Sequence, residues 1–157
     1  MSSVLTVFHV HFIKSERENG SMSSRPLPRV SEYAKPFWEG VKAGKLLIQR
    51  CRACGSYQHY PRPGCASCGS RELEWVESSG RGRVYSVTVP RVVIGEMKAF
   101  EGEIPYAIAM VDLEEGVRIL ARVTGYARPE GVSIGDEVVF EPVDVGGFWL
   151  PYFRKAL

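Results

Sequence analysis

Four cysteines in two matched pairs are the residues whose type and spacing point most directly to chemistry. Two residues separate Cys51 from Cys54 and Cys65 from Cys68, and a glycine follows each pair. Two cysteines at this spacing can both point at one ion, and a tetrahedral site needs two such pairs. The glycine permits a positive φ, which turns backbone N–H groups toward the sulfur atoms. We therefore expect one metal ion held by four thiolates.

The cysteine pattern leaves two alternatives open. Iron in place of zinc would give a rubredoxin-like electron carrier, because tetrahedral sulfur sites take either metal. Two structural disulfides would need an oxidising compartment, and the sequence shows no export signal. We favour one structural Zn²⁺ ion, because four protein ligands close the coordination shell and leave no position for an activated water. The missing signal also predicts a cytoplasmic location.

Residues for acid–base or covalent catalysis are scarce once the cysteines are assigned to a metal. The chain has three histidines, and two of them, His9 and His11, lie in the N-terminal segment. The third, His59, is the one remaining candidate base, and we expect it to pack beside Tyr57 and Tyr60. The sequence contains neither a nucleophile elbow nor a phosphate-binding loop. It therefore predicts a protein that is not an enzyme by itself.

Composition predicts the elements that must position the metal. The chain has 157 residues, 45% hydrophobic and 24% charged, which is a globular composition and excludes wholesale disorder. Sixteen glycines and ten prolines favour short strands and turns over a helical bundle. No apolar run is long enough for a transmembrane helix, so we expect no contact with a membrane.

The chain divides into three predicted parts. Residues 1–21 form a tail or an extra strand, 22–79 a helical segment plus a zinc ribbon, and 80–157 a barrel domain. Pro36 suits the first turn of a helix, and a strand at 46–49 runs into the first cysteine. Five short strands are expected in the last part, which indicates a closed barrel of the OB type. Those strands are predicted at 84–89, 105–112, 117–124, 138–143 and 148–153.

Nucleic-acid binding is the first functional alternative, because zinc ribbons and OB barrels often bind nucleic acid. Such barrels follow the phosphates with a basic groove and stack bases on exposed aromatic rings. The formal charge of the chain is only +2, and residues 80–157 carry nine Lys and Arg against eleven Asp and Glu. The acidic balance of the barrel half disfavours this partner.

The order of several further motifs resembles a known family. A helical Phe37-Trp38 pair precedes Gly44-Lys-Leu46 and the two cysteine pairs, and three barrel motifs follow. Those three are Gly82-Arg-Val-Tyr-Ser-Val-Thr88, Pro105-Tyr-Ala107 and Gly135-Asp-Glu-Val138. This order is similar to that of the zinc-ribbon/OB-fold family first known as a domain of unknown function and associated with acyl-CoA enzymes. The match covers about residues 25–155 and leaves 1–21 outside.

The resemblance implies a mainly β fold with an N-terminal helical segment, a rubredoxin-like zinc ribbon and a C-terminal five-stranded OB barrel. Members of the family are accessory subunits of thiolase-fold enzymes and also accompany aldolases or hydratases. They bridge or shape a CoA-ester site and leave the chemistry to the partner. On this resemblance we expect a non-catalytic subunit that binds or helps to position acyl-CoA beside a thiolase-like, aldolase or hydratase partner. The resemblance supplies no catalytic residue.

Adjacent aromatic residues and local cations are the candidate contacts with a ligand or partner. One helix face cannot hide both Phe37 and Trp38, and the Phe148-Trp149 pair follows two flexible glycines. The negative charges of CoA would need cations nearby. Packing in the core explains the aromatic pairs equally well, and solvation at the surface explains each cation. The candidates are Phe37, Trp38, Lys42, Lys45, Arg81, Arg83, Phe148 and Trp149.

Overall fold

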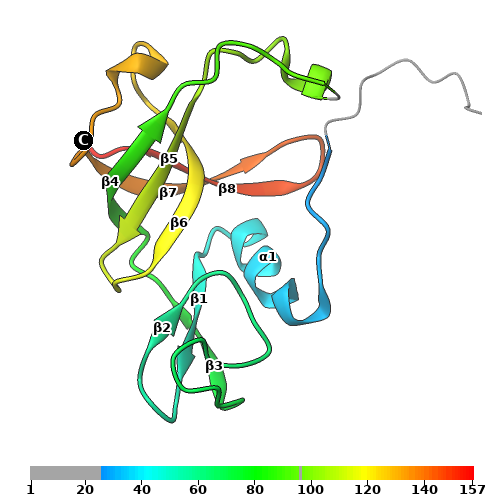
Figure 1. Cartoon of the computed structure of the whole chain (residues 1–157), viewed down its shortest axis with the longest axis vertical. Helices are drawn as coiled ribbons and strands as arrows, with labels where there is room; N and C mark the ends of the chain where they lie inside the picture. Colours follow the sequence, from blue (N-terminus) through cyan, green and yellow to red (C-terminus); the bar gives the residue numbers. More distant parts are fainter. Residues whose placement is uncertain (1–25, 96) are drawn as a thin grey trace, which may run out of the picture.

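A three-stranded ribbon sheet, a short helix and a closed barrel make up the computed structural model, which describes residues 26–95 and 97–157 (Figure 1). The expectations for residues 1–21, including the two histidines there, lie outside the described residues. The elements in chain order are η1 Glu32–Ala34, α1 Lys35–Lys42, β1 Leu47–Cys51, β2 Tyr57–Gln58, β3 Leu73–Glu77, β4 Arg81–Thr88, η2 Met97–Phe100, β5 Ala107–Leu113, β6 Arg118–Thr124, η3 Pro129–Gly131, β7 Glu137–Asp144 and β8 Trp149–Lys155.

The helix α1 begins with Pro36 in its first turn, as predicted, and ends before Gly44. Gly44 has a φ of +80°, and the N–H of Lys45 donates to the Gly40 carbonyl over 2.8 Å, which satisfies a terminal carbonyl. Phe37 and Val41 lie one turn apart and are buried against β1 and β8. None of the helices in the described ranges is long and apolar enough to cross a membrane.

The ribbon sheet has the order β2-β1-β3, with both neighbours antiparallel to β1. The predicted strand at 46–49 is confirmed as β1, which runs directly into the first cysteine. In the centre of the sheet, Gln49 lies opposite Gln58 on one side and Trp75 on the other. The sheet thus carries both ends of the cysteine-bearing loops.

The barrel closes in the order β4-β5-β6-β8-β7, and its one parallel pair joins β6 to β8. This arrangement is that of an OB fold, and all five predicted strands are confirmed with ends shifted by a few residues. Along β5, fully buried residues alternate with partly buried ones, as expected for a strand with one face on the core. Gly82 is required where β4 pairs with β5, because a Cβ there would lie 2.6 Å from the Asp112 carbonyl oxygen.

One hydrophobic core continues from the helix and the start of β1 into the barrel. Val41, Leu46 and Ile48 belong to the same cluster as Val111 and Phe153 of the barrel, and each is at most 1% exposed. The ribbon sheet of β1, β2 and β3 extends away from the barrel (Figure 1). The predicted boundary between residues 79 and 80 stays a prediction, but the shared core ties the two parts together.

A hydrogen-bonded link fixes the crossing from ribbon to barrel. Ser78 is buried and makes two hydrogen bonds at this crossing. Its N–H donates to the Leu46 carbonyl over 2.8 Å, and its hydroxyl donates to Glu115 over 2.9 Å. The N–H of Ser79 donates to the same carboxylate over 2.6 Å. Glu115 lies in the turn between β5 and β6, so a barrel turn holds the end of the ribbon.

Candidate functional site

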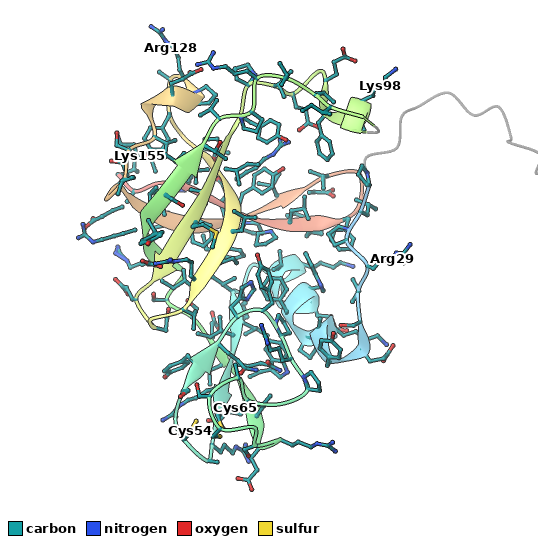
Figure 2. The ribbon with its side chains drawn as sticks, in the orientation of Figure 1. Arg29, Cys54, Cys65, Lys98, Arg128 and Lys155 are labelled. Atoms are coloured by element: carbon teal, nitrogen blue, oxygen red, sulfur yellow. The ribbon has the colours of Figure 1, made fainter. Side chains whose placement is uncertain are left out.

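The four thiols come together at the tip of the ribbon, as the spacing predicts. Figure 2 shows Cys54 and Cys65 at this tip, at the end of the molecule opposite to the labelled Arg128. The Sγ atoms of Cys51 and Cys68 lie 3.7 Å apart, those of Cys54 and Cys65 3.6 Å apart, and all four lie within 4.8 Å of one another. With Zn–S bonds of about 2.3 Å, a regular tetrahedron has an edge of about 3.8 Å. The thiol spacing therefore fits one tetrahedral ion, and all four cysteines are free of disulfides.

The two cysteine loops have the same backbone structure. The N–H of Gly55 donates to the Cys51 carbonyl over 2.8 Å, and the N–H of Gly69 donates to the Cys65 carbonyl over 2.9 Å. Both glycines have a φ of +76°, a conformation that residues with a Cβ rarely adopt. The glycine after each pair, noted in the sequence, is thus the residue that closes each turn.

Local hydrogen bonds favour the thiolate form at two of the four sulfur atoms. Backbone hydrogen bonds from Cys68 and Ser67 lower the pKa of Cys65. Hydrogen bonds with Ser56 lower the pKa of Cys54 to about 6. Because metal ligands must be deprotonated, these contacts favour cation binding at Cys54 and Cys65. At Cys68 the backbone hydrogen bond from Ser70 lowers the pKa, but hydrogen bonds with the neighbouring thiols and burial outweigh it and raise the pKa to about 12. Four thiolates suit zinc or iron, and four protein ligands leave no open position for substrate.

Two buried glutamines position the loop between the cysteine pairs, and sequence reasoning missed them. Gln58 donates from Nε2 to Gln49 Oε1 over 2.7 Å. Gln49 in turn accepts from the Arg62 N–H over 2.8 Å and donates to the Arg62 carbonyl over 3.0 Å. Gln58 also accepts from the N–H of Ala66, next to Cys65, over 2.8 Å. The pair therefore anchors the second cysteine loop to β1 and β2.

An aromatic cleft of about 440 Å³ is the second candidate site. It lies between the segment before α1, the helix itself, the loop at residues 59–61 and the outer face of β5, β6 and β8. Phe37 meets Trp38 edge to face at 5.0 Å between ring centroids and meets His59 at 5.1 Å. The His59 ring lies 4.2 Å from Tyr60, so the expected contact between these two is present. Aromatic and apolar side chains thus form most of its wall.

The structure brings some of the predicted contact residues together. Phe37, only 3% exposed, and the half-buried Trp38 both line the cleft. Phe148 packs on Trp38 with 5.1 Å between ring centroids. Trp149 lies on β8, opposite Asp144 of β7, and packs against the core. The helix pair and Phe148 therefore form one aromatic group, and Trp149 packs against the core at the start of β8.

The four predicted cations do not gather in one place. Arg81 and Arg83 line a groove of about 490 Å³ on the barrel that includes neither lysine in its wall. Arg83 is paired with Glu137, and Lys45 donates to Glu77 over 2.8 Å. Lys42 is exposed in the last turn of α1. This arrangement does not concentrate positive charge on a single CoA head group.

Arg122, which the sequence did not single out, lines the cleft from β6. Its guanidinium carbon lies 3.6 Å from the centre of the Tyr106 ring, and Nη1 donates to Glu103. Its Nη2 is buried and has no hydrogen-bond partner among the described residues, and the same is true of His59 Nε2. No local sequence motif indicates that a nitrogen of a strand arginine will be buried, so only the fold reveals this feature of Arg122.

The buried imidazole predicts a pH-dependent stability. Burial lowers the pKa of His59 from 6.5 to about 4. The unfolded chain therefore binds a proton at His59 more tightly than the folded chain does. The contribution of the neutral imidazole to the free energy of unfolding is complete above pH 6.5 and is lost as the pH falls toward about 4. Between about pH 7 and about pH 5 we expect wild type to lose about 2 kcal/mol more than His59→Phe in urea unfolding. Both proteins have the same four cysteines, so any metal release at low pH lowers the stability of both equally. Equal losses of stability in the two proteins would therefore contradict the burial of a neutral imidazole.

A zinc ribbon joined to an OB barrel is the class that this fold and its four-thiol site define. Two family models match the chain: "ChsH2, rubredoxin-like zinc ribbon domain" over residues 38–74 and "ChsH2, C-terminal OB-fold domain" over residues 75–141. In the solved structure titled "Ltp2-ChsH2(DUF35) aldolase", one chain aligns with a TM-score of 0.73 and 36% identity, covering 83% of this chain and 100% of that one. The chain belongs to this DUF35/ChsH2 family.

Curated relatives include enzyme subunits. The "Benzoylsuccinyl-CoA thiolase subunit BbsA" of Geobacter metallireducens is 37% identical over 127 residues, 79% of this chain and 83% of that protein. A "Probable enoyl-CoA hydratase alpha subunit" of Thermomonospora curvata is 36% identical over 143 residues, 90% of this chain. The chain spans only 43% of the length of the hydratase subunit.

Proposed function

We propose that this chain is a non-catalytic accessory subunit that binds or helps to position acyl-CoA in a complex with a thiolase-like, aldolase or hydratase partner. The observation that carries the proposal is the likeness to the benzoylsuccinyl-CoA thiolase subunit, because the alignment spans 83% of that subunit. The likeness therefore concerns a subunit of similar extent.

The metal in this proposal is one structural zinc ion. The observed thiol spacing and the family's zinc ribbon support zinc, and Cys51, Cys54, Cys65 and Cys68 would hold it. Bound zinc supplies a cross-link between the two cysteine loops, and the closed ligand set gives it no role in activating water. The chain's own contribution is to hold both loops at the ribbon tip through the Gln49–Gln58 pair.

The site chemistry supports a subunit that leaves bond-making to its partner. The four thiols lie together as a metal-ligand set, so none is placed as a nucleophile. His59 has a buried Nε2 without a partner among the described residues, and burial lowers its pKa to about 4. A base with so low a pKa is a weak proton acceptor near neutral pH.

The test is recovery of the partner from the native source. With a tag on this chain, we expect a thiolase-like, hydratase or aldolase protein to co-purify in fixed stoichiometry, and the complex to turn over an acyl-CoA. The purified chain alone should turn over no thioester. Thioester turnover by the chain alone, or recovery of nucleic acid in place of an acyl-CoA enzyme, would contradict the proposal.

A further inference from the structure

The aromatic cleft has the size and lining of a site for an apolar ring system. Its volume is about 440 Å³, within the range of pockets that take small organic ligands. Trp38, Tyr60 and Phe100 come to it from three separate segments, and Ile108 and Leu120 contribute from the barrel. Tyr60 is 53% exposed and Leu120 49% exposed, although both are apolar in most of their surface. Such a wall loses contact with water when a flat apolar group enters.

Two polar atoms in this wall have unused hydrogen-bonding capacity. Arg122 Nη2 and His59 Nε2 are both buried without a partner among the described residues. Leaving a buried polar group unpaired costs about 1–3 kcal/mol, and more when the group is charged. The guanidinium is held in place by the Tyr106 ring and by Glu103, so its free N–H groups have a fixed direction.

Both residues line the cleft, and exposed side chains of the same wall lie next to them. Leu120 is two residues before Arg122 on β6 and therefore shares its face of the strand, while the Tyr60 ring lies 4.2 Å from His59. These two exposed side chains can move without disturbing the core. An oxygen acceptor that enters beside Leu120 therefore approaches the face of β6 that carries Arg122.

We propose that the cleft binds a ring-bearing acyl group, whose rings stack on its aromatic wall and whose carbonyl or carboxylate oxygen accepts a hydrogen bond from Arg122. Charge complementarity favours a ligand with such an oxygen, because the Arg122 guanidinium carries unpaired donors that an oxygen acceptor satisfies. The printed name of the thiolase relative, a benzoylsuccinyl-CoA enzyme, describes an acyl group of this kind. The inference rests on the proposed function for the choice of an acyl ester as the natural ligand.

The test uses 2-naphthoate as the probe and isothermal titration of the full chain. We expect a Kd below about 1 mM, which corresponds to about −4.1 kcal/mol. Leu120→Trp fills the cleft at a half-exposed position and should weaken binding at least about tenfold. The matched control is Ile134→Trp, which adds the same ring at a position 72% exposed and outside the cleft wall, and it should bind like wild type.

Two further experiments, a substitution at Arg122 and a competition between ligands, identify the part of the ligand that is bound. Arg122→Met should also weaken 2-naphthoate binding about tenfold, because the oxygen loses its donor. 2-Naphthoyl-CoA should compete with 2-naphthoate, whereas CoA alone should not, since the cleft takes the acyl part. Absence of 2-naphthoate binding, wild-type affinity in Leu120→Trp, or displacement by CoA alone would each overturn the inference.

The binding assay and the partner assay fail independently. If the tagged chain recovers an acyl-CoA enzyme but does not bind 2-naphthoate, only the assignment of the cleft is wrong. If the chain binds 2-naphthoate as described but recovers no such enzyme, the subunit role is wrong and the cleft remains a binding site for apolar acids.

Discussion

Removing the metal with a chelator will unfold the cysteine-bearing half of the ribbon and leave the barrel folded. Zinc bound by four cysteines contributes about 10–16 kcal/mol in small domains, which is as large as the whole stability of an ordinary domain. The cysteine loops have few buried apolar residues of their own, and the core lies in α1, the start of β1 and the barrel. The metal is therefore the main support of the ribbon tip.

Hydrogen exchange measured by mass spectrometry checks this result region by region. After chelation, amides in residues 52–70 should lose their protection, while those of β4 to β8 should keep it. Phe37, Val41, Leu46 and Ile48 belong to the core that includes the barrel, so amides in α1 and early β1 should also stay protected. Loss of protection throughout the barrel in step with metal release would show that the two parts are one cooperative unit.

Replacing Gln49 with methionine should destabilise the folded chain by about 3–4 kcal/mol, although the two side chains have similar length and volume. Gln49 is 4% exposed and makes three hydrogen bonds, two to the backbone of Arg62 and one to Gln58. The thioether leaves these buried groups unpaired, at about 1–3 kcal/mol each. The loop that carries Cys65 should then loosen, so zinc affinity should fall as well.

Urea unfolding and a competitive zinc titration measure the two effects. Tyr57→Phe is the matched control, because Tyr57 precedes Gln58 on β2 but is 39% exposed, and we expect its stability to stay within about 0.5 kcal/mol of wild type. A Gln49→Met protein as stable as the control, with unchanged zinc affinity, would mean that the glutamine pair does not position the cysteine loops.

The metal site and the barrel strands could be predicted because each depends on local patterns. Two cysteines at a spacing of three, followed by glycine, form a turn that needs only its own residues. Alternating apolar residues likewise mark a strand such as β5, whichever strands become its neighbours. The order of the motifs then supplied the family and the closure of the barrel.

The cleft and the glutamine pair depend on contacts between distant segments, and for that reason the sequence did not reveal them. Gln49 and Arg122 look like ordinary polar residues on amphipathic strands until the fold buries Gln49 and the Nη2 atom of Arg122. The sequence also did not reveal that two of the four candidate cations have carboxylate partners on other strands: Glu77 pairs with Lys45 and Glu137 with Arg83. Pairing across strands cannot be read from composition.

Native mass spectrometry of the complex recovered from the source organism tests the central claim most directly. The account predicts that this chain carries one zinc ion and is bound to a thiolase-like, hydratase or aldolase enzyme, with no acyl-CoA turnover when the chain is released. A metal-free chain with its thiols oxidised in pairs, or a chain that is recovered alone and turns over the thioester itself, would contradict the account.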